Sequence, residues 1–236
     1  MGTLCENCFN LYPEAMSDAE TSPLPVAAGS EPATPVRKRP KPGERRVQIL
    51  QALASMLEQP GAERITTAAL AARLDVSEAA LYRHFASKAQ MFEGLIEFIE
   101  QTVFSLVNQI AERESTLASD DSGAGSRHAV KVISMLIQFA EKNPGMTRVM
   151  VGDALVFENE RLQQRMNQFF DKIESTLKQS LRVSSDASGS ATPSVDAQVQ
   201  ASALTAFVMG RMQRFARSGF KRMPSEYLEA SLSLML

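Results

Sequence analysis

A short stretch of this chain, residues 66–88, concentrates side chains of the kinds that bind nucleic acid. Their hydroxyl, imidazole and cationic groups stand near expected helix ends, at Thr66, Thr67, Ser77, Tyr82, Arg83, His84 and Lys88. Such groups, together with the N–H groups of helix N-termini, hydrogen-bond to phosphate oxygens. The chemistry that they indicate is non-covalent recognition of DNA.

Two short helices joined by a tight turn are predicted to position these groups. Thr66 is a good N-cap for the first helix, and Ser77 is a good N-cap for the second. Glu78 places a negative charge in the first turn, where the helix dipole favours it. Two packed helices with a short turn form a helix-turn-helix, whose second helix can enter the DNA major groove. The spacing alone leaves a second interpretation open, a surface hairpin whose Tyr82 and His84 are merely half-buried.

A long helix is predicted to follow directly. Ser87 and Gln90 form a capping box that begins it, and it should run from Lys88 to about Arg113. Its apolar residues are too many for a single stripe, so it should be buried on more than one side and link the helix-turn-helix to a larger body.

The rest of the chain also shows helical periods and no strand pattern, so the predicted fold class is all-α. A first helix, 44–58, precedes the helix-turn-helix and is stopped by Pro60-Gly61. Later helices are expected over 127–142, a short segment from Pro144, 154–182, 194–219 and 225–236, with polar loops at 115–126 and 183–193.

The helix over 194–219 carries a face rich in small residues, made by Val195, Val199, Ala203, Ala206, Met209 and Gly210. Such a face lets helices approach closely. It fits a four-helix interface between two copies of the last helix pair, and we favour this homodimer because a helix-turn-helix protein normally reads a two-fold site. Packing within one chain is the alternative.

Charge is distributed unevenly along the 236 residues, whose net charge is −2. Residues 1–36 hold five acidic residues and no Lys or Arg, whereas residues 37–88 carry a net charge of +5. Local charge decides electrostatic steering, so the positive field lies where DNA binding needs it. Residues 1–36, the leader, are predicted to be disordered. Its basic run at 37–46 is either a DNA-contacting arm or a solvated tail.

The sequence shows no Ser/His/Asp set, no paired-carboxylate site and no metal-ligand spacing. We therefore expect no enzyme, no cofactor and no metal site. Cys5 and Cys8 form a lone C-x-x-C, a weak redox or zinc signal. His128 lies at a loop–helix boundary and is expected to be exposed. Neither a secretory leader nor a membrane-spanning apolar run is present, so we expect a cytoplasmic protein without membrane contact.

The segment A-A-R-L-D-V-S-E-A-A-L-Y-R-H-F-A-S-K, which ends at Lys88, resembles the TetR family of DNA-binding regulators. Asp75 stands where that family usually has Gly, at a turn that needs a positive φ, and Asp tolerates this conformation at modest cost. The resemblance implies a TetR-like fold of about nine helices. Its parts would be a leader with a basic arm (1–43), a helix-turn-helix domain (44–87) and a helical core and dimerisation domain (88–236).

Longer stretches, such as L-I-E-F-I-E and E-K-N-P-G-M-T-R, are similar to TetR-type proteins that act in nucleoid occlusion. That resemblance covers residue 44 to the C-terminus. It implies binding to palindromic double-stranded chromosomal DNA through Thr66 and the helix Ser77–Phe85, which includes Glu78 and Ala79. The protein would therefore be associated with the nucleoid.

The same resemblance implies a protein partner, the tubulin-like division GTPase FtsZ. Phe98 and the Lys142-Asn143 pair match positions that engage FtsZ, although the family has Arg in place of Lys142. We expect the FtsZ tail to dock in a groove between the 88–113 helix and the end of the 127–142 helix. The competing function is a ligand-responsive transcriptional repressor, with Phe and Met residues of the body lining an inducer pocket.

Overall fold

The computed structural model describes residues 43–59, 65–117 and 123–236. Within these ranges it contains nine α-helices, one 3-10 helix and no strand, which confirms the predicted all-α class. In chain order they are α2 (Glu44–Leu57), α3 (Thr67–Arg73), α4 (Glu78–Tyr82), α5 (Lys88–Leu117), α6 (Ala124–Lys142), α7 (Pro144–Met150), the 3-10 helix η2 (Asp153–Leu155), α8 (Glu160–Ala187), α9 (Pro193–Arg217) and α10 (Leu228–Met235).

Several predictions fall on residues outside the described ranges. They concern the acidic leader, the Cys5/Cys8 pair, the basic run as far as Pro42, the helix stop at Pro60-Gly61 and the centre of the 115–126 loop. These stay predictions.

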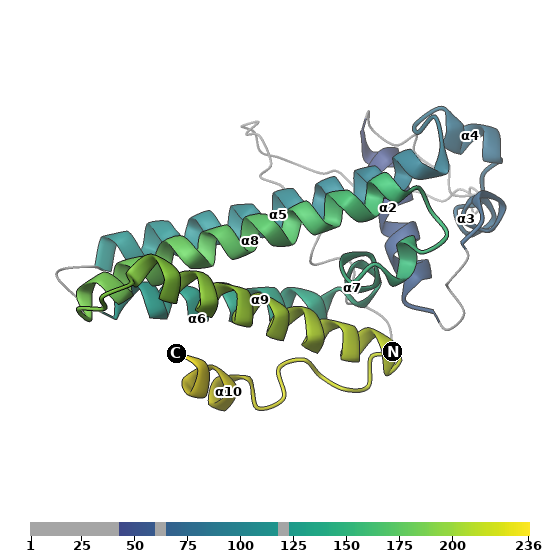
Figure 1. The fold of residues 1–236 in the computed structure, drawn as a ribbon. Helices are drawn as coiled ribbons and strands as arrows, with labels where there is room; N and C mark the ends of the chain where they lie inside the picture. The colour runs from purple at the N-terminus through teal and green to yellow at the C-terminus, as the bar shows by residue number, and fades with distance from the viewer. Residues whose placement is uncertain (1–42, 60–64, 118–122) are drawn as a thin grey trace, which may run out of the picture.

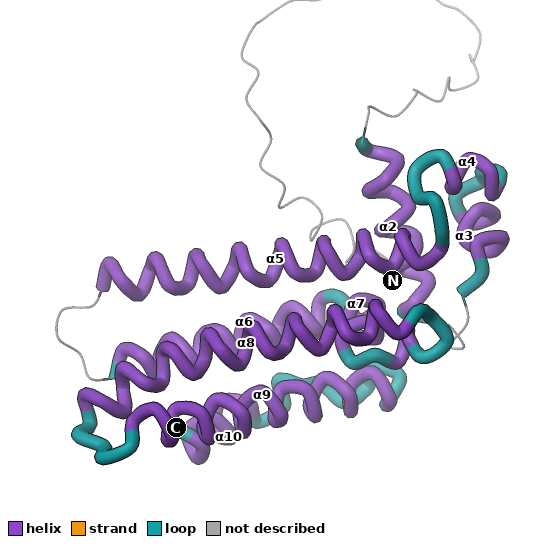
Figure 2. Tube along the Cα trace, turned by 45° about the horizontal axis from the view of Figure 1, so that its top comes forward, coloured by secondary structure: helices purple, strands orange, loops and turns teal. Residues whose placement is uncertain are grey.

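The body is a bundle of four long helices, α5, α6, α8 and α9, whose directions alternate along the chain (Figure 1). The head, α2–α4, lies at the end of the bundle where α5 and α8 begin and where α6 and α9 finish (Figures 1 and 2). One continuous apolar core runs from Ile49 in the head through Leu95 to Met212 in α9. Head and body therefore share a core, which restricts their relative movement.

The boundaries of α8 differ from the predicted helix at 154–182. The helix begins only at Glu160, because the Asn159 side chain caps it by accepting the Arg161 N–H at 2.9 Å. It then continues to Ala187, so the predicted loop at 183–193 is wrong over its first half. The polar end of α8 is used in packing, since Ser184 Oγ accepts the Ser126 N–H at 3.0 Å from the start of α6.

His128 is buried, and the expectation that it is exposed is wrong. It lies on α6 where this helix approaches α8 so closely that a Cβ on Gly125 would be 2.1 Å from the Ser180 carbonyl oxygen. Its side chain is 8 % exposed, with Nδ1 at 2.8 Å from Ser180 Oγ. Nε2 has no hydrogen-bond partner among the described residues. The sequence could not show this, because the approach joins residues about fifty positions apart.

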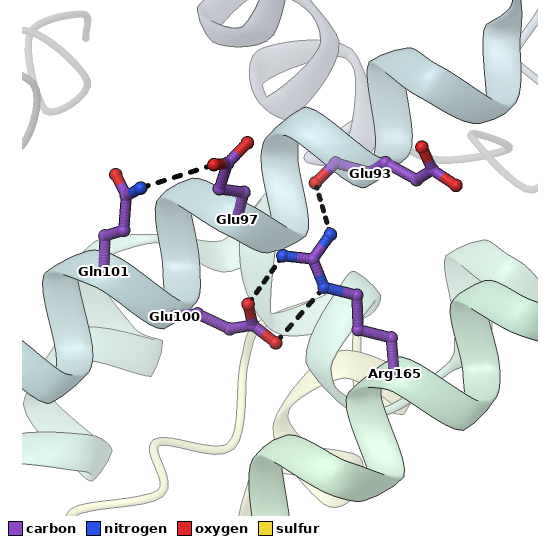
Figure 3. A network of polar contacts seen from close by, with 5 residues as sticks. All are labelled: Glu93, Glu97, Glu100, Gln101 and Arg165. Atoms are coloured by element: carbon purple, nitrogen blue, oxygen red, sulfur yellow. Dashed lines mark hydrogen bonds and ion pairs between the residues drawn. The ribbon is translucent and has the colours of Figure 1, made fainter.

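Arg165 links α8 to α5 in the part of the bundle nearest the head (Figure 3). From α8, its guanidinium pairs in a bidentate fashion with Glu100 of α5, at 2.6 and 3.3 Å, and it donates to the Glu93 carbonyl at 3.4 Å. The hydrogen bond to Glu100 raises the pKa of Arg165. Because both partners are partly shielded from water, this pair fixes the register of α8 against α5 more firmly than a surface pair would.

A second contact joins head and body through α2 and α7. Gly145 brings α7 so close to α2 that a Cβ there would be 2.0 Å from the Ala54 carbonyl oxygen. Burial at this contact raises the pKa of Glu58, while the Gly145 N–H and Arg73 oppose the shift. Only a residue without a side chain fits the position, so the helix pair depends on Gly145.

Acidification should destabilise the protein through His128. Burial lowers the pKa of His128 from its ordinary value; Glu114 opposes this shift and Lys131 adds to it. The unfolded chain, whose histidine titrates near 6.5, therefore binds more protons than the folded chain as pH falls through that value, and the free energy of unfolding decreases. We expect urea denaturation at pH 7.5 and 5.5 to show a smaller loss of stability for His128→Asn than for the natural chain. Equal losses would contradict this.

Candidate nucleic-acid interface

Both helices of the helix-turn-helix begin at the predicted caps. Thr66 Oγ1 accepts the Ala69 N–H at 3.2 Å, and Ser77 Oγ accepts the Ala80 N–H at 3.3 Å. Both capping residues have extended backbone, as N-caps do. The positions of α3 and α4 are therefore set by local hydrogen bonds that the sequence predicts.

The turn between the helices forms around Asp75, whose φ is 52°. The Asp75 N–H donates to Ala72 O at 3.2 Å, and the Val76 N–H donates to Ala71 O at 3.1 Å. This is a Schellman motif with Asp in the left-handed position that usually holds Gly. The prediction that the turn survives the replacement of Gly by Asp is confirmed.

The predicted interface residues divide by burial. The apolar side of the motif, Leu70, Leu81 and Phe85, is buried. The opposite side is exposed and holds Thr66, Ser77, Glu78, Ala79, Tyr82, Arg83 and His84. Tyr82 is 45 % exposed, and His84 is exposed as well. The Arg83 guanidinium has no partner among the described residues, so the face presents free donors to solvent.

Two further predicted residues, Thr67 and Lys88, make contacts inside the protein. Thr67 Oγ1 donates to Glu78 Oε2 at 2.6 Å, which joins the starts of α3 and α4. Lys88 pairs with Glu158 in the segment before α8, and its ammonium lies 5.7 Å from the Phe92 ring centre. Lys88 thus links the start of α5 to the segment before α8 in this structure.

Sequence reasoning missed the role of Arg46. From α2, its guanidinium donates to the His84 carbonyl at 3.1 Å and lies 4.2 Å from the Phe85 ring centre. Arg46 thereby holds the residues that follow α4 against α2. The basic run suggested an arm, and no local signal pairs Arg46 with a residue 38 positions away.

Arg46 also lines a groove beside Phe98, on the face where α2 crosses α5. The groove has a volume of about 360 Å³, and its other lining residues are Gly43, Val47, Leu50, Gly94, Glu97 and Gln101. The groove at Phe98 therefore lies between α5 and α2, and not between α5 and the end of α6 as expected. Lys142 is exposed on α6 and is not part of its lining, and the buried Asn143 amide donates to Phe139 O at 2.8 Å.

Comparison with known proteins defines the class. Residues 49–95 match the family model for bacterial regulatory proteins of the tetR family, and residues 127–236 match the SlmA-like tetracyclin repressor-like C-terminal domain. FadR of Bacillus subtilis, solved in complex with stearoyl-CoA, has the same fold, with a TM-score of 0.62 over 80 % of this chain and 96 % of that one at 14 % identity. The head and bundle are those of a TetR-type regulator.

Closer relatives narrow the family. The nucleoid occlusion factor SlmA of Aliivibrio fischeri (strain MJ11) is 51 % identical over 79 % of this chain and 91 % of its own length. SlmA of Vibrio cholerae is 48 % identical over 81 % of this chain and 93 % of its own. The chain belongs to the SlmA family of TetR-type proteins.

Loss of the Thr66 hydroxyl should weaken DNA binding. Thr66→Ala removes a helix cap and an exposed phosphate donor, so we expect an affinity loss of about 1–2 kcal/mol for a selected duplex. Fluorescence anisotropy measures this. Thr176→Ala, on α8 and far from the head, is the matched control and should bind normally. An unchanged Thr66→Ala titration would remove Thr66 from the interface.

Proposed function

We propose that this protein is a nucleoid occlusion factor. It binds palindromic chromosomal sites as a homodimer in the cytoplasm and, while bound, engages FtsZ and blocks septum assembly over the nucleoid. The observation that carries the proposal is the exposed polar face of α3 and α4, in a chain about half identical to SlmA proteins along most of their length. No described helix has the length and apolar character needed to cross a membrane.

DNA binding is supported by the chemistry of this face. Thr66 and Ser77 offer hydroxyls for phosphate oxygens, and Arg83 and His84 carry donors at the far end of α4. Tyr82 would present both an apolar ring and a hydroxyl to the major groove of the DNA. Since phosphate contacts release counterions, affinity should fall steeply with salt.

Dimer formation is supported by the outer face of α9. Val195 and Val199 are 60 % and 64 % exposed, and Ala203, Ala206 and Met209 are also exposed. A Cβ on Gly210 would meet no atom within 4 Å. The chain therefore leaves its small-residue face uncovered, which argues against the intrachain alternative and for a second copy.

FtsZ binding is assigned to the groove beside Phe98. Val47, Leu50 and the Phe98 ring supply apolar contacts, and Arg46 adds a cation for an acidic peptide. Such a combination of an apolar anchor and a charge suits a short linear segment. Lys142 and Asn143 do not line this groove, so Lys142 would act at a separate point of contact, and Asn143 would act by ending α6.

The same residues connect the groove to the DNA-binding face. Phe85, at the end of the α4 segment, lies against Gly94, where a Cβ would be 3.1 Å from its ring. Arg46 touches Phe85 and lines the groove as well. A small shift of α4 on DNA would move groove-lining atoms directly, and coupling free energies of about 1–3 kcal/mol are typical of such linkage.

The ligand-responsive repressor receives less support. In the described part of the body, Phe side chains pack on one another, with ring centres of Phe104 and Phe169 at 5.5 Å and of Phe169 and Phe170 at 5.1 Å. The Phe residues thus serve the core.

Truncation of Phe98 should separate the two binding activities. Phe98→Ala removes the apolar anchor, so we expect loss of co-sedimentation with FtsZ polymers in the presence of a selected duplex, while duplex affinity stays within twofold of the natural chain. Phe157→Ala is the matched control, because Phe157 is 71 % exposed outside the groove, and it should retain both activities. If Phe98→Ala lost DNA affinity equally, Phe98 would be a core residue and the groove assignment would fail.

A charge on the α9 face should prevent association. Val199→Glu would place a carboxylate in the centre of the apolar interface, where an unpaired charge is costly. We expect a monomer by analytical ultracentrifugation and a loss of cooperative binding to a palindromic duplex. The exposed Val156→Glu, outside this face, should remain dimeric. A dimeric Val199→Glu would place the interface elsewhere.

A further inference from the structure

A pocket rich in arginine lies at the C-terminal end of α9, and it shares no lining residue with the Phe98 groove. Arg211 and Arg214 of α9 form one wall, and Arg222, Met223, Glu226 and Tyr227 from the segment before α10 form the other. Its volume is about 410 Å³. This end of α9 is the one nearest the head, while α10 folds back beneath the bundle (Figures 1 and 2).

Arg211 connects the two walls of the pocket by hydrogen bonds. Its guanidinium donates to the backbone carbonyls of Pro224 and Glu226 and to Ser231 Oγ, and it lies 4.8 Å from the Phe207 ring centre. With its donors taken up by the protein, this arginine fixes the position of the segment opposite α9.

The same segment is anchored at two more points. Ser218 Oγ accepts the N–H groups of Lys221 and Arg222, at 3.1 and 2.9 Å. Glu141 of α6 accepts the Ser225 N–H at 2.9 Å. The wall that carries Arg222 and Tyr227 is therefore preformed, as small-molecule sites usually are.

Charge in the pocket is unbalanced. The guanidinium groups of Arg214 and Arg222 have no ion-pair or hydrogen-bond partner among the described residues, and Glu226 is the one acidic residue of the described lining. Two free guanidinium groups across a preformed cavity are arranged to hold an anion, and their planar forks match phosphate oxygens.

An exposed apolar surface lies beside these cations. The Tyr227 side chain is 77 % exposed, in a left-handed backbone conformation with φ of 54°, and Met223 is 46 % exposed. An exposed aromatic ring beside two guanidinium groups can stack on a nucleobase whose phosphate the cations bind. The volume of the pocket also falls in the range of about 300–1,000 Å³ usual for small-ligand sites.

We propose that this pocket binds a nucleotide, with the phosphate between Arg214 and Arg222 and the base against Tyr227 and Met223. The pocket contains none of the residues assigned to DNA or to the Phe98 groove, and it would give the protein a response to a small phosphorylated metabolite. Glu226 weakens the site by repelling the phosphate.

Isothermal titration calorimetry on the full-length protein tests the proposal, with AMP as the probe and with inorganic phosphate and adenosine as its two halves. We expect saturable AMP binding that is tighter than binding of either half. Arg222→Ala should weaken it about tenfold or more, since a charge-assisted contact to phosphate is lost. Glu226→Gln should tighten it.

Lys221→Ala is the matched control. It removes one positive charge from the neighbouring residue, it keeps the backbone bond to Ser218, and it lies outside the pocket lining. Its AMP affinity should stay within twofold of the natural chain. Equal losses in Lys221→Ala and Arg222→Ala would reduce the effect to general charge attraction and overturn the site. Absent AMP binding, or phosphate binding as tight as AMP binding, would overturn the nucleotide assignment.

Discussion

Phe85 packs at the point where the head meets the body, and the exposure of the DNA-binding face depends on this contact. Its side chain is 1 % exposed, lies against Gly94 of α5, and is covered by the Arg46 guanidinium of α2. α4 is only five residues long and could not stay helical alone. Burial of Phe85 holds its C-terminal end in place, and the Ser77 cap holds its start, so the polar side of the helix is directed to solvent.

The long helix α5 connects this contact at Phe85 to the groove and to the rest of the bundle. It begins at Lys88, with the Ser87 hydroxyl accepting the Gln90 N–H at 3.2 Å and the Gln90 side chain accepting the Ala86 N–H at 2.8 Å. Within four turns it carries Gly94 and Phe98 at the groove and Glu100 at the Arg165 pair. Helix α5 contacts the head, lines the groove and carries Glu100 of the ion pair to α8. A shift of α5 at one of these places can therefore move atoms at the others.

The sequence predicts what local chemistry decides. The caps at Thr66 and Ser77, the turn at Asp75 and the start of α5 follow from residues within five positions of each other, so the sequence predicts them. Lys88, Arg46 and His128 differ, because their roles are set by partners far away in the chain: Glu158, His84 and Ser180. A polar residue shows its type in the sequence but not its partner, so neither the ion pair of Lys88 nor the burial of His128 could be predicted.

Hydrogen–deuterium exchange, with and without a selected palindromic duplex, tests the central claim most directly. The claim is that the exposed side of α3 and α4 holds DNA, and that Phe85 passes its effect to α5. The account predicts slower exchange on DNA binding in peptides covering residues 66–84, with a smaller change in peptides covering 91–101. Protection confined to the body, with exchange in residues 66–84 unaltered by DNA, would contradict it.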